Sequence, residues 1–232
     1  MTLIIDGKEF DFVDFGASKG GSIEVGIRRL GGRRGLGIDL KDAKIAVMKE
    51  KGYDCIQGDV TNLDLPDKCV RFVIMSHLLE HLPDLDAVRK TIKEAARIAT
   101  DFIFLRIPYF DTDEYLESLG LKFFWSHWRG HPCRLKSWEL REIFEDLGLA
   151  DHEIMGGFPI LGSDDPSLHP LASPIDQFEY DPEKHPPKPE VGIEKPLFRE
   201  LVSIVMLKKF KGWEQVLEKV DAMYGARTKS AE

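Results

Sequence analysis

Three residues about a third of the way along the chain have the types and spacing of a metal-dependent hydrolase. His77, Glu80 and His81 form H-x-x-E-H, the pattern of inverted zinc peptidases, in which the histidines bind zinc and the glutamate acts as base. That chemistry requires both histidines on one face of a continuous helix. Pro83 follows two residues after His81 and interrupts such a helix. We therefore do not favour a zinc site, and we expect no bound metal.

A second pair of histidines, His127 and His131, lies in the aromatic stretch at residues 123–132, FFWSHWRGHP. Their spacing would suit metal binding on a helix, but the glycine and proline in this stretch predict a loop. Imidazole titrates near neutral pH and is a natural base for a hydroxyl proton. His81, His127 and His131 are therefore the candidate catalytic residues. The alternative for each is a packing role.

The elements that must position these histidines are clearest at residues 10–40. An apolar run rich in strand-forming residues ends at Gly16, and Gly20 follows in the same turn. Glycines there let the backbone pass close to a ligand. Residues 23–30 have the spacing of a helix packed on a sheet, and a second short strand ends at Asp39. This is the pattern of a nucleotide-binding βαβ unit, whose ligand lies outside the carboxyl ends of the strands.

Strands and helices continue to alternate after this unit. Further strands are predicted at 53–57, 70–76, 101–107, 152–158 and 198–207. The last strand follows no crossover helix, so we expect it to pair antiparallel with a neighbour. We expect one domain over residues 1–232, with a proline-rich insertion at about 159–196 and a C-terminal helix at about 212–224. The insertion could be a lid over the substrate or an arm of a homodimer.

Four segments stand in register at the ends of predicted strands. They are Asp14-Phe15-Gly16-Ala17-Ser18-Lys19-Gly20, the acids Asp39 and Asp59, and Ser76–Asp84. In this register the chain resembles the class I S-adenosylmethionine-dependent methyltransferase superfamily. One departure is Ser18, where the family usually has glycine. The resemblance implies an α/β fold with a Rossmann-like, doubly wound, mostly parallel seven-stranded sheet and an antiparallel last strand.

The resemblance also implies S-adenosyl-L-methionine as cofactor and a role for each acid. Asp39 would accept hydrogen bonds from the ribose hydroxyls, Asp59 would accept from the adenine amino group, and Asp14 would face the ammonium of the methionine part. The alternative for each acid is a strand-end residue that caps the next helix. The implied cofactor-binding residues are Asp14, Gly16, Ser18, Gly20, Asp39, Leu40, Asp59, Val60, Ser76 and His77, the last two through backbone carbonyls.

Composition constrains the partners and the compartment. The chain has 40 acidic residues against 32 lysines and arginines, with no long basic tract, so broad nucleic-acid binding is not favoured. Cys55, Cys69 and Cys133 form no CxxC pair, which indicates reduced thiols in a cytoplasmic protein. The N-terminus does not read as a signal peptide, and no apolar run is long enough to span a membrane.

These observations predict methyl transfer to a small-molecule or glycan-like acceptor, with a hydroxyl as the preferred acceptor and nitrogen or carbon left open. One alternative is a nicotinamide-dependent oxidoreductase, because Gly16-x-Ser18-x-x-Gly21 is close to a dinucleotide fingerprint. That alternative gives no necessary role to Asp59 or Ser76–Asp84. The other alternative is a protein that binds S-adenosylmethionine without catalysis.

Overall fold

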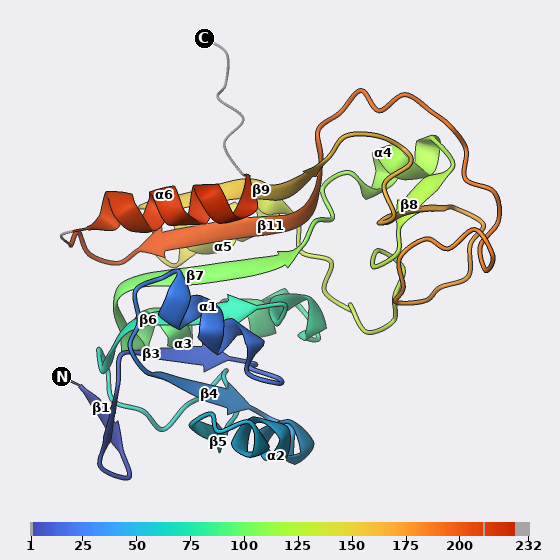
Figure 1. The fold of residues 1–232 in the computed structure, drawn as a ribbon. Helices are drawn as coiled ribbons and strands as arrows, with labels where there is room; N and C mark the ends of the chain where they lie inside the picture. Colours follow the sequence, from blue (N-terminus) through green and yellow to red (C-terminus); the bar gives the residue numbers. More distant parts are fainter. Residues whose placement is uncertain (1, 211, 226–232) are drawn as a thin grey trace.

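The centre of the molecule is a seven-stranded sheet in the order β5-β4-β3-β6-β7-β11-β9, seen in a computed structural model that describes residues 2–210 and 212–225 (Figure 1). β11 (Leu197–Met206) pairs antiparallel with both β7 and β9 (His152–Ile160). The predicted mostly parallel α/β sheet with an antiparallel last strand is confirmed. The parallel strands are β3 (Phe12–Phe15), β4 (Gly35–Asp39), β5 (Cys55–Gln57), β6 (Val70–Ser76) and β7 (Ala99–Pro108).

Helices cover both faces of the sheet, which makes the fold doubly wound (Figure 1). α1 (Gly21–Arg28), α2 (Asp42–Glu50) and α6 (Trp213–Tyr224) bury apolar residues on one face. α3 (Leu85–Ile98) and α5 (Ser137–Asp146) do so on the other. The parallel strands β3, β4, β6 and β7 are buried along most of their length, whereas β5 at the edge of the sheet is only partly buried.

Three phenylalanines stack across the middle of the sheet and fix the position of α1. The ring centroids of Phe12 and Phe72 are 4.7 Å apart, and those of Phe72 and Phe102 are 4.6 Å apart. A Cβ atom at Gly26 in α1 would lie 2.4 Å from the Phe12 ring. Because Gly26 has no side chain, α1 can pack close to the sheet. The position of α1 in turn determines the position of the glycine-rich turn that precedes it.

The N-terminal residues form a separate hairpin of β1 (Leu3–Ile5) and β2 (Lys8–Phe10), joined at Asp6-Gly7. Phe10 therefore belongs to the hairpin and not to the first parallel strand, which begins at Phe12. The strand predicted to begin at residue 53 begins at Cys55. Among the residues that the structure describes, no helix is long and apolar enough to cross a membrane.

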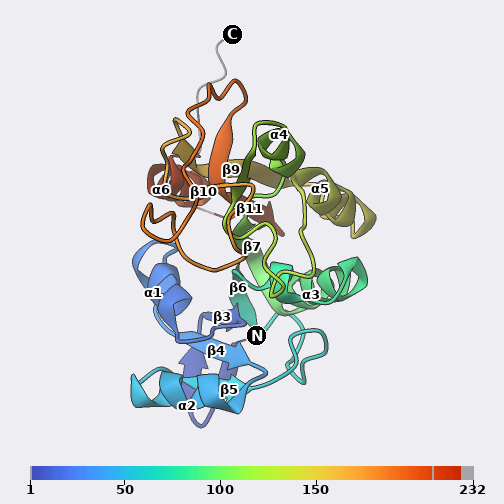
Figure 2. The same ribbon diagram turned by 90° about the vertical axis from the view of Figure 1, so that its right-hand side faces the viewer.

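A cap lies beyond the carboxyl end of β7 (Figure 2). It contains α4 (Asp113–Ser118) and a two-stranded sheet of β8 (Leu121–Phe123) and β10 (Leu168–Pro170), which the sequence did not predict. The proline-rich segment is attached to this sheet, because the buried Lys122 ammonium donates to the carbonyl of Ser173 over 2.6 Å. Two segments far apart in the sequence, around residues 109–135 and 161–196, therefore cover one end of the sheet.

Candidate active site

A groove of about 600 Å³ lies beside the carboxyl ends of β3, β4 and β5. Strand ends form it because parallel strands present their following loops at the same edge of a sheet. Most of the residues that the resemblance assigned to the cofactor line it, namely Gly16, Ser18, Asp39, Leu40, Asp59, Val60 and His77. The sequence did not assign Lys41, Lys44, Leu78, Leu82 and Trp128, which also line the groove.

The carboxylate of Asp39 fixes the backbone of the glycine-rich turn. The backbone at Gly16 has φ 65°, and a Cβ atom there would lie 2.7 Å from Cδ1 of Leu78. Ser18 also has a left-handed φ of 50°, which is uncommon for a residue with a side chain. Its N–H donates to Asp39 Oδ2 over 3.0 Å, and the N–H of Lys41 donates to Oδ1 over 3.0 Å. One carboxylate therefore fixes both the turn and the start of the next loop.

The wall formed after β4 and β5 combines carboxylates with apolar surface. Asp59 Oδ1 accepts hydrogen bonds from the backbone N–H and the hydroxyl of Thr61, at 2.9 and 2.8 Å. Leu40 is 65% exposed beside the groove, and Val60 is buried beneath it. An exposed apolar side chain between two carboxylates suits a flat, partly apolar ring that carries hydroxyl and amino donors.

Three of the assigned residues, Asp14, Gly20 and Ser76, are not part of the groove lining. Asp14 is fully buried under the turn, where the Ser22 hydroxyl donates to Oδ2 over 2.5 Å. Burial raises the pKa of Asp14 to about 7, although the hydrogen bond from Ser22 opposes this shift. Ser76 Oγ accepts a hydrogen bond from Arg106 Nε over 2.7 Å. Asp14 and Ser76 therefore contact neighbouring side chains and do not line the groove.

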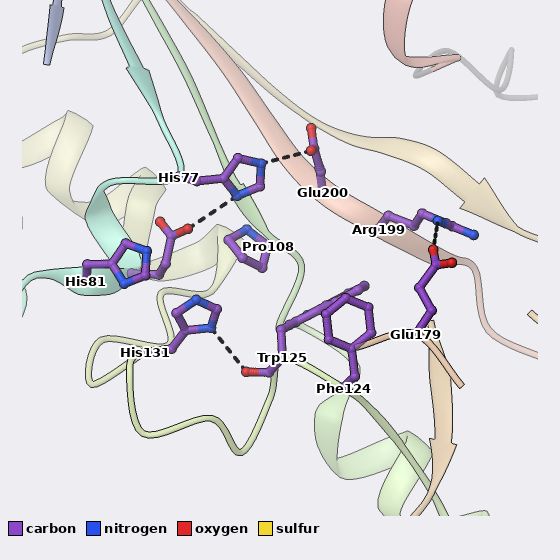
Figure 3. A pocket seen from close by; sticks show the side chains of 10 residues that line it. His77, His81, Pro108, Phe124, Trp125, His131, Glu179, Arg199 and Glu200 are labelled. Atoms are coloured by element: carbon purple, nitrogen blue, oxygen red, sulfur yellow. Dashed lines mark hydrogen bonds and ion pairs between the residues drawn. The ribbon is translucent and has the colours of Figure 1, made fainter. Parts of the chain in front are cut away.

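A second cavity of about 380 Å³ lies under the cap (Figure 3). Its walls come from the loop after β6, the end of β7, the 124–131 loop, the proline-rich segment and β11. His77 and His81 line both this cavity and the groove. The two volumes therefore meet at these histidines. The lining residues are His77, Glu80, His81, Pro108, Phe124, Trp125, His131, Glu179, Arg199 and Glu200.

The side chain of His77 stands between two glutamates at this junction (Figure 3). Its Nε2 lies 3.0 Å from Glu200 Oε1, and its Nδ1 lies 3.3 Å from Glu80 Oε1. Burial disfavours the charged imidazole, but the hydrogen bond to Glu200 and the nearby negative charge of Glu80 outweigh it and raise the pKa of His77 to about 9. His77 is therefore a cation at neutral pH and cannot act as a base there.

His81 and His131 lie together at one wall of the cavity, with ring centroids 5.0 Å apart. His81 Nδ1 is 2.7 Å from the carbonyl of Gly130, and His131 Nδ1 is 3.1 Å from the carbonyl of Trp125. Burial lowers the pKa of His131, so this imidazole is neutral at pH 7. His127 lines neither volume, and its Nε2 lies 2.9 Å from Glu117 Oε1.

The H-x-x-E-H segment does not form the helix of a zinc peptidase. Only Leu79–His81 is helical, as one 3-10 turn, and the backbone is extended again at Leu82. His77 and His81 have different partners, the carboxylate of Glu200 and the carbonyl of Gly130.

Sequence reasoning missed the three charged residues on the far wall of the cavity, Glu179, Arg199 and Glu200. Arg199 and Glu200 are the only charged residues of β11, whose sequence is otherwise apolar apart from one serine. Charged residues in an apolar strand were the available signal. Glu179 lies in the proline-rich segment, where no pattern distinguished it.

Known proteins share this architecture. Residues 13–101 match the family model described as a methyltransferase domain. A SAM-dependent methyltransferase from Archaeoglobus fulgidus aligns with 84% of this chain and 85% of its own, with a TM-score of 0.56 and 19% identity. A chain from the complex of the Haloferax volcanii Trm112 methyltransferase activator with a methyltransferase aligns with 86% of this chain and 82% of its own, with a TM-score of 0.56 and 18% identity.

The YcgJ protein from Bacillus subtilis aligns with 65% of this chain, and the alignment spans 66% of YcgJ, with a TM-score of 0.51 and 21% identity. At such identities these likenesses concern the fold alone. A search of the curated proteins finds no match.

Proposed function

We propose that this chain, whose residues 13–101 match the methyltransferase-domain family, is a class I S-adenosylmethionine-dependent methyltransferase. In this proposal the groove holds S-adenosylmethionine, and the cavity under the cap holds a small-molecule methyl acceptor. The observation that carries this proposal is the junction of the two volumes at His77 and His81. A methyl group at the inner end of the groove would face the cavity through this junction. The family assignment also favours methyl transfer over the nicotinamide and non-catalytic alternatives.

The residues of the groove fit the cofactor. Gly16 leaves open a cradle that a Cβ atom would close against Leu78. Asp39 and Asp59 each keep lone pairs beyond those used by backbone donors, because a carboxylate accepts about four hydrogen bonds. We propose that Asp39 holds the ribose hydroxyls, that Asp59 holds the adenine amino group, and that Leu40 and Val60 contact the ring.

S-adenosylmethionine, when bound, supplies a methyl group on a positively charged sulfur. The protein then has to hold acceptor and methyl close and aligned, and to keep water away. Phe124 and Trp125 from the cap and Pro108 from β7 provide the apolar walls for this. We propose that the proline-rich segment, which contributes Glu179, acts as a lid over the acceptor.

The acceptor is proposed to be a small molecule that is methylated on a hydroxyl. A cavity of about 380 Å³ fits a small molecule and cannot enclose a folded macromolecule. Two histidines at its wall, His81 and His131, are placed to activate a hydroxyl, whereas His127 is outside. Arg199 and Glu200 would orient polar groups of the acceptor.

The test is a methyl-transfer screen. Purified protein is incubated with S-adenosylmethionine and sets of hydroxylated, amino and carboxylate small molecules, and S-adenosylhomocysteine release is measured. We expect release with a hydroxylated compound and a loss of at least about 100-fold in His131→Ala, the scale of general-base or positioning contributions. Turnover only with amines would contradict the choice of a hydroxyl. Turnover on none of the three sets would contradict a small-molecule acceptor.

A further inference from the structure

The carboxylate of Glu80 is buried and receives no hydrogen bond from any residue in the described part of the chain. Its residue is 1% exposed, and neither carboxylate oxygen has a hydrogen-bond partner among the residues that the structure describes. The imidazole of His77 is near Oε1, but at 3.3 Å and without hydrogen-bond geometry. Leaving a buried charged group without donors costs free energy, so such a group indicates a ligand that completes its surroundings.

The two neighbouring histidines are oriented with their free nitrogens available. Nδ1 of His81 faces the carbonyl of Gly130, and Nδ1 of His131 faces the carbonyl of Trp125. A carbonyl only accepts hydrogen bonds, so each Nδ1 carries the hydrogen and each Nε2 keeps its lone pair. Metal-binding histidines are held in this way, with the second nitrogen donating to a carbonyl or carboxylate.

The three side chains converge. Glu80, His81 and His131 offer ligand atoms that all lie within 4.8 Å of one another. Ligand atoms on one ion, at roughly 2.1 Å from it, lie about 3 to 4 Å apart, so small side-chain rotations suffice. Figure 3 shows His81 and His131 beside each other at the cavity wall, and His81 is an exposed residue.

We propose that Glu80, His81 and His131 bind a divalent first-row transition metal ion. Two imidazoles and one carboxylate suit Zn²⁺, Co²⁺, Mn²⁺ or Fe²⁺ better than Mg²⁺ or Ca²⁺, which prefer oxygen ligands. Three protein ligands leave open positions, and these face the cavity proposed for the acceptor. This deepens the proposed function and rests on it: the acceptor is a compound whose hydroxyl oxygen binds the metal and is thereby made more acidic.

The proposed site is not the one that H-x-x-E-H suggested, and it departs from the expectation of no metal. The sequence pattern paired His77 with His81 and gave Glu80 the role of base. In the structure the second histidine ligand is His131, which lies 50 residues after His81 in the sequence. His77 instead contacts Glu80 Oε1 from behind and is held by Glu200, so it orients the carboxylate.

Direct metal binding tests this proposal. Protein stripped with a chelator is titrated with Zn²⁺ and with Co²⁺, by calorimetry and by the visible absorption of Co²⁺. We expect one ion per chain, and an affinity at least about 100-fold lower in Glu80→Gln and in His131→Ala. His127→Ala is the matched control, because its imidazole lies outside both volumes, and it should bind as wild type does.

Titration with S-adenosylhomocysteine on the same proteins separates the two proposals. Glu80 and His131 do not line the groove, so both variants should bind it as wild type does, which also shows that they fold. No metal binding by wild type, or equal metal loss in His127→Ala, would overturn the metal site and leave the cofactor groove intact. If the wild-type protein does not bind S-adenosylhomocysteine, the result would instead count against the proposed function.

Discussion

The imidazole of His77 and the carboxylate of Glu200 are separated by 123 positions in the sequence, yet Nε2 and Oε1 are 3.0 Å apart. Arg106 Nη1 lies 3.3 Å from the same carboxylate, and Arg106 Nε donates to Ser76. This network joins the ends of β6, β7 and β11 at the place where the groove and the cavity meet.

Removing the cation from this network should destabilise the protein. His77→Asn retains a residue type that tolerates the left-handed φ of 52°, but it removes the positive charge beside Glu80 and leaves Glu200 with Arg106 alone. We expect a loss of about 1–3 kcal/mol in the free energy of unfolding, less than for a fully buried pair because the side chain is 39% exposed. Urea unfolding measures it.

The double variant provides the control. Adding Glu200→Gln to His77→Asn removes one of the two carboxylates that His77 contacts. Part of the loss in the free energy of unfolding should therefore be recovered. Strictly additive losses would show that His77 and Glu200 are not coupled.

The buried Asp14 should make stability depend on pH. Its pKa is about 7 in the folded protein, against about 3.9 in an unfolded chain, so the folded state binds the proton more tightly. The stabilisation that this gives is complete below pH 4 and is lost as the pH rises through 7. Asp14→Asn has no carboxyl group to titrate, so its free energy of unfolding should rise by about 1–3 kcal/mol relative to that of wild type between pH 5 and pH 8. Unfolding of both proteins is measured without cofactor at pH 5 and at pH 8. The same difference between variant and wild type at the two pH values would contradict this prediction.

Two glycines of α1 should differ sharply in their tolerance of a methyl group. A Cβ atom at Gly26 would lie 2.4 Å from the Phe12 ring, whereas nothing lies within 4 Å of a Cβ atom at Gly21. Gly26→Ala should cost about 1–3 kcal/mol through overpacking, and Gly21→Ala should be neutral or stabilising. Thermal unfolding of the pair measures this, and similar melting temperatures would show that α1 does not pack as described.

The carboxylate of Asp39 should account for part of the cofactor affinity. It fixes the N–H groups of Ser18 and Lys41 and is proposed to hold the ribose. Asp39→Ala should weaken S-adenosylhomocysteine binding by about 1–3 kcal/mol, the scale of a lost charged hydrogen bond. Asp59→Ala serves as the comparison, with a smaller loss expected because its carboxylate is exposed. Unchanged binding in Asp39→Ala would place the ribose elsewhere.

The parts of the molecule that local sequence determines were predictable. Apolar runs mark the strands, Asp39 is the last residue of β4, and Asp59 lies two residues after the end of β5. The positions of both acids at one sheet edge therefore follow from the parallel order of the strands. The tertiary meeting of β8 with β10 was not predictable, because both are three residues long and about 45 positions apart.

The acceptor side resisted prediction for the same reason. His127 and His131 looked equivalent in sequence, and only the fold of their loop places His131 in the cavity and His127 outside it. The partnership of His77 with Glu200 depends on the pairing of β11 beside β7, which no local pattern encodes. Glu80 attracted attention only as part of a zinc motif, and its burial became visible with the fold.

The cofactor of the groove is tested most directly by calorimetric titration of the purified chain with S-adenosylhomocysteine and, separately, with NAD⁺. We expect one S-adenosylhomocysteine bound per chain, weaker binding in Asp39→Ala, and no heat of binding with NAD⁺. Absence of S-adenosylhomocysteine binding, or saturable binding of NAD⁺ in the same groove, would contradict this expectation.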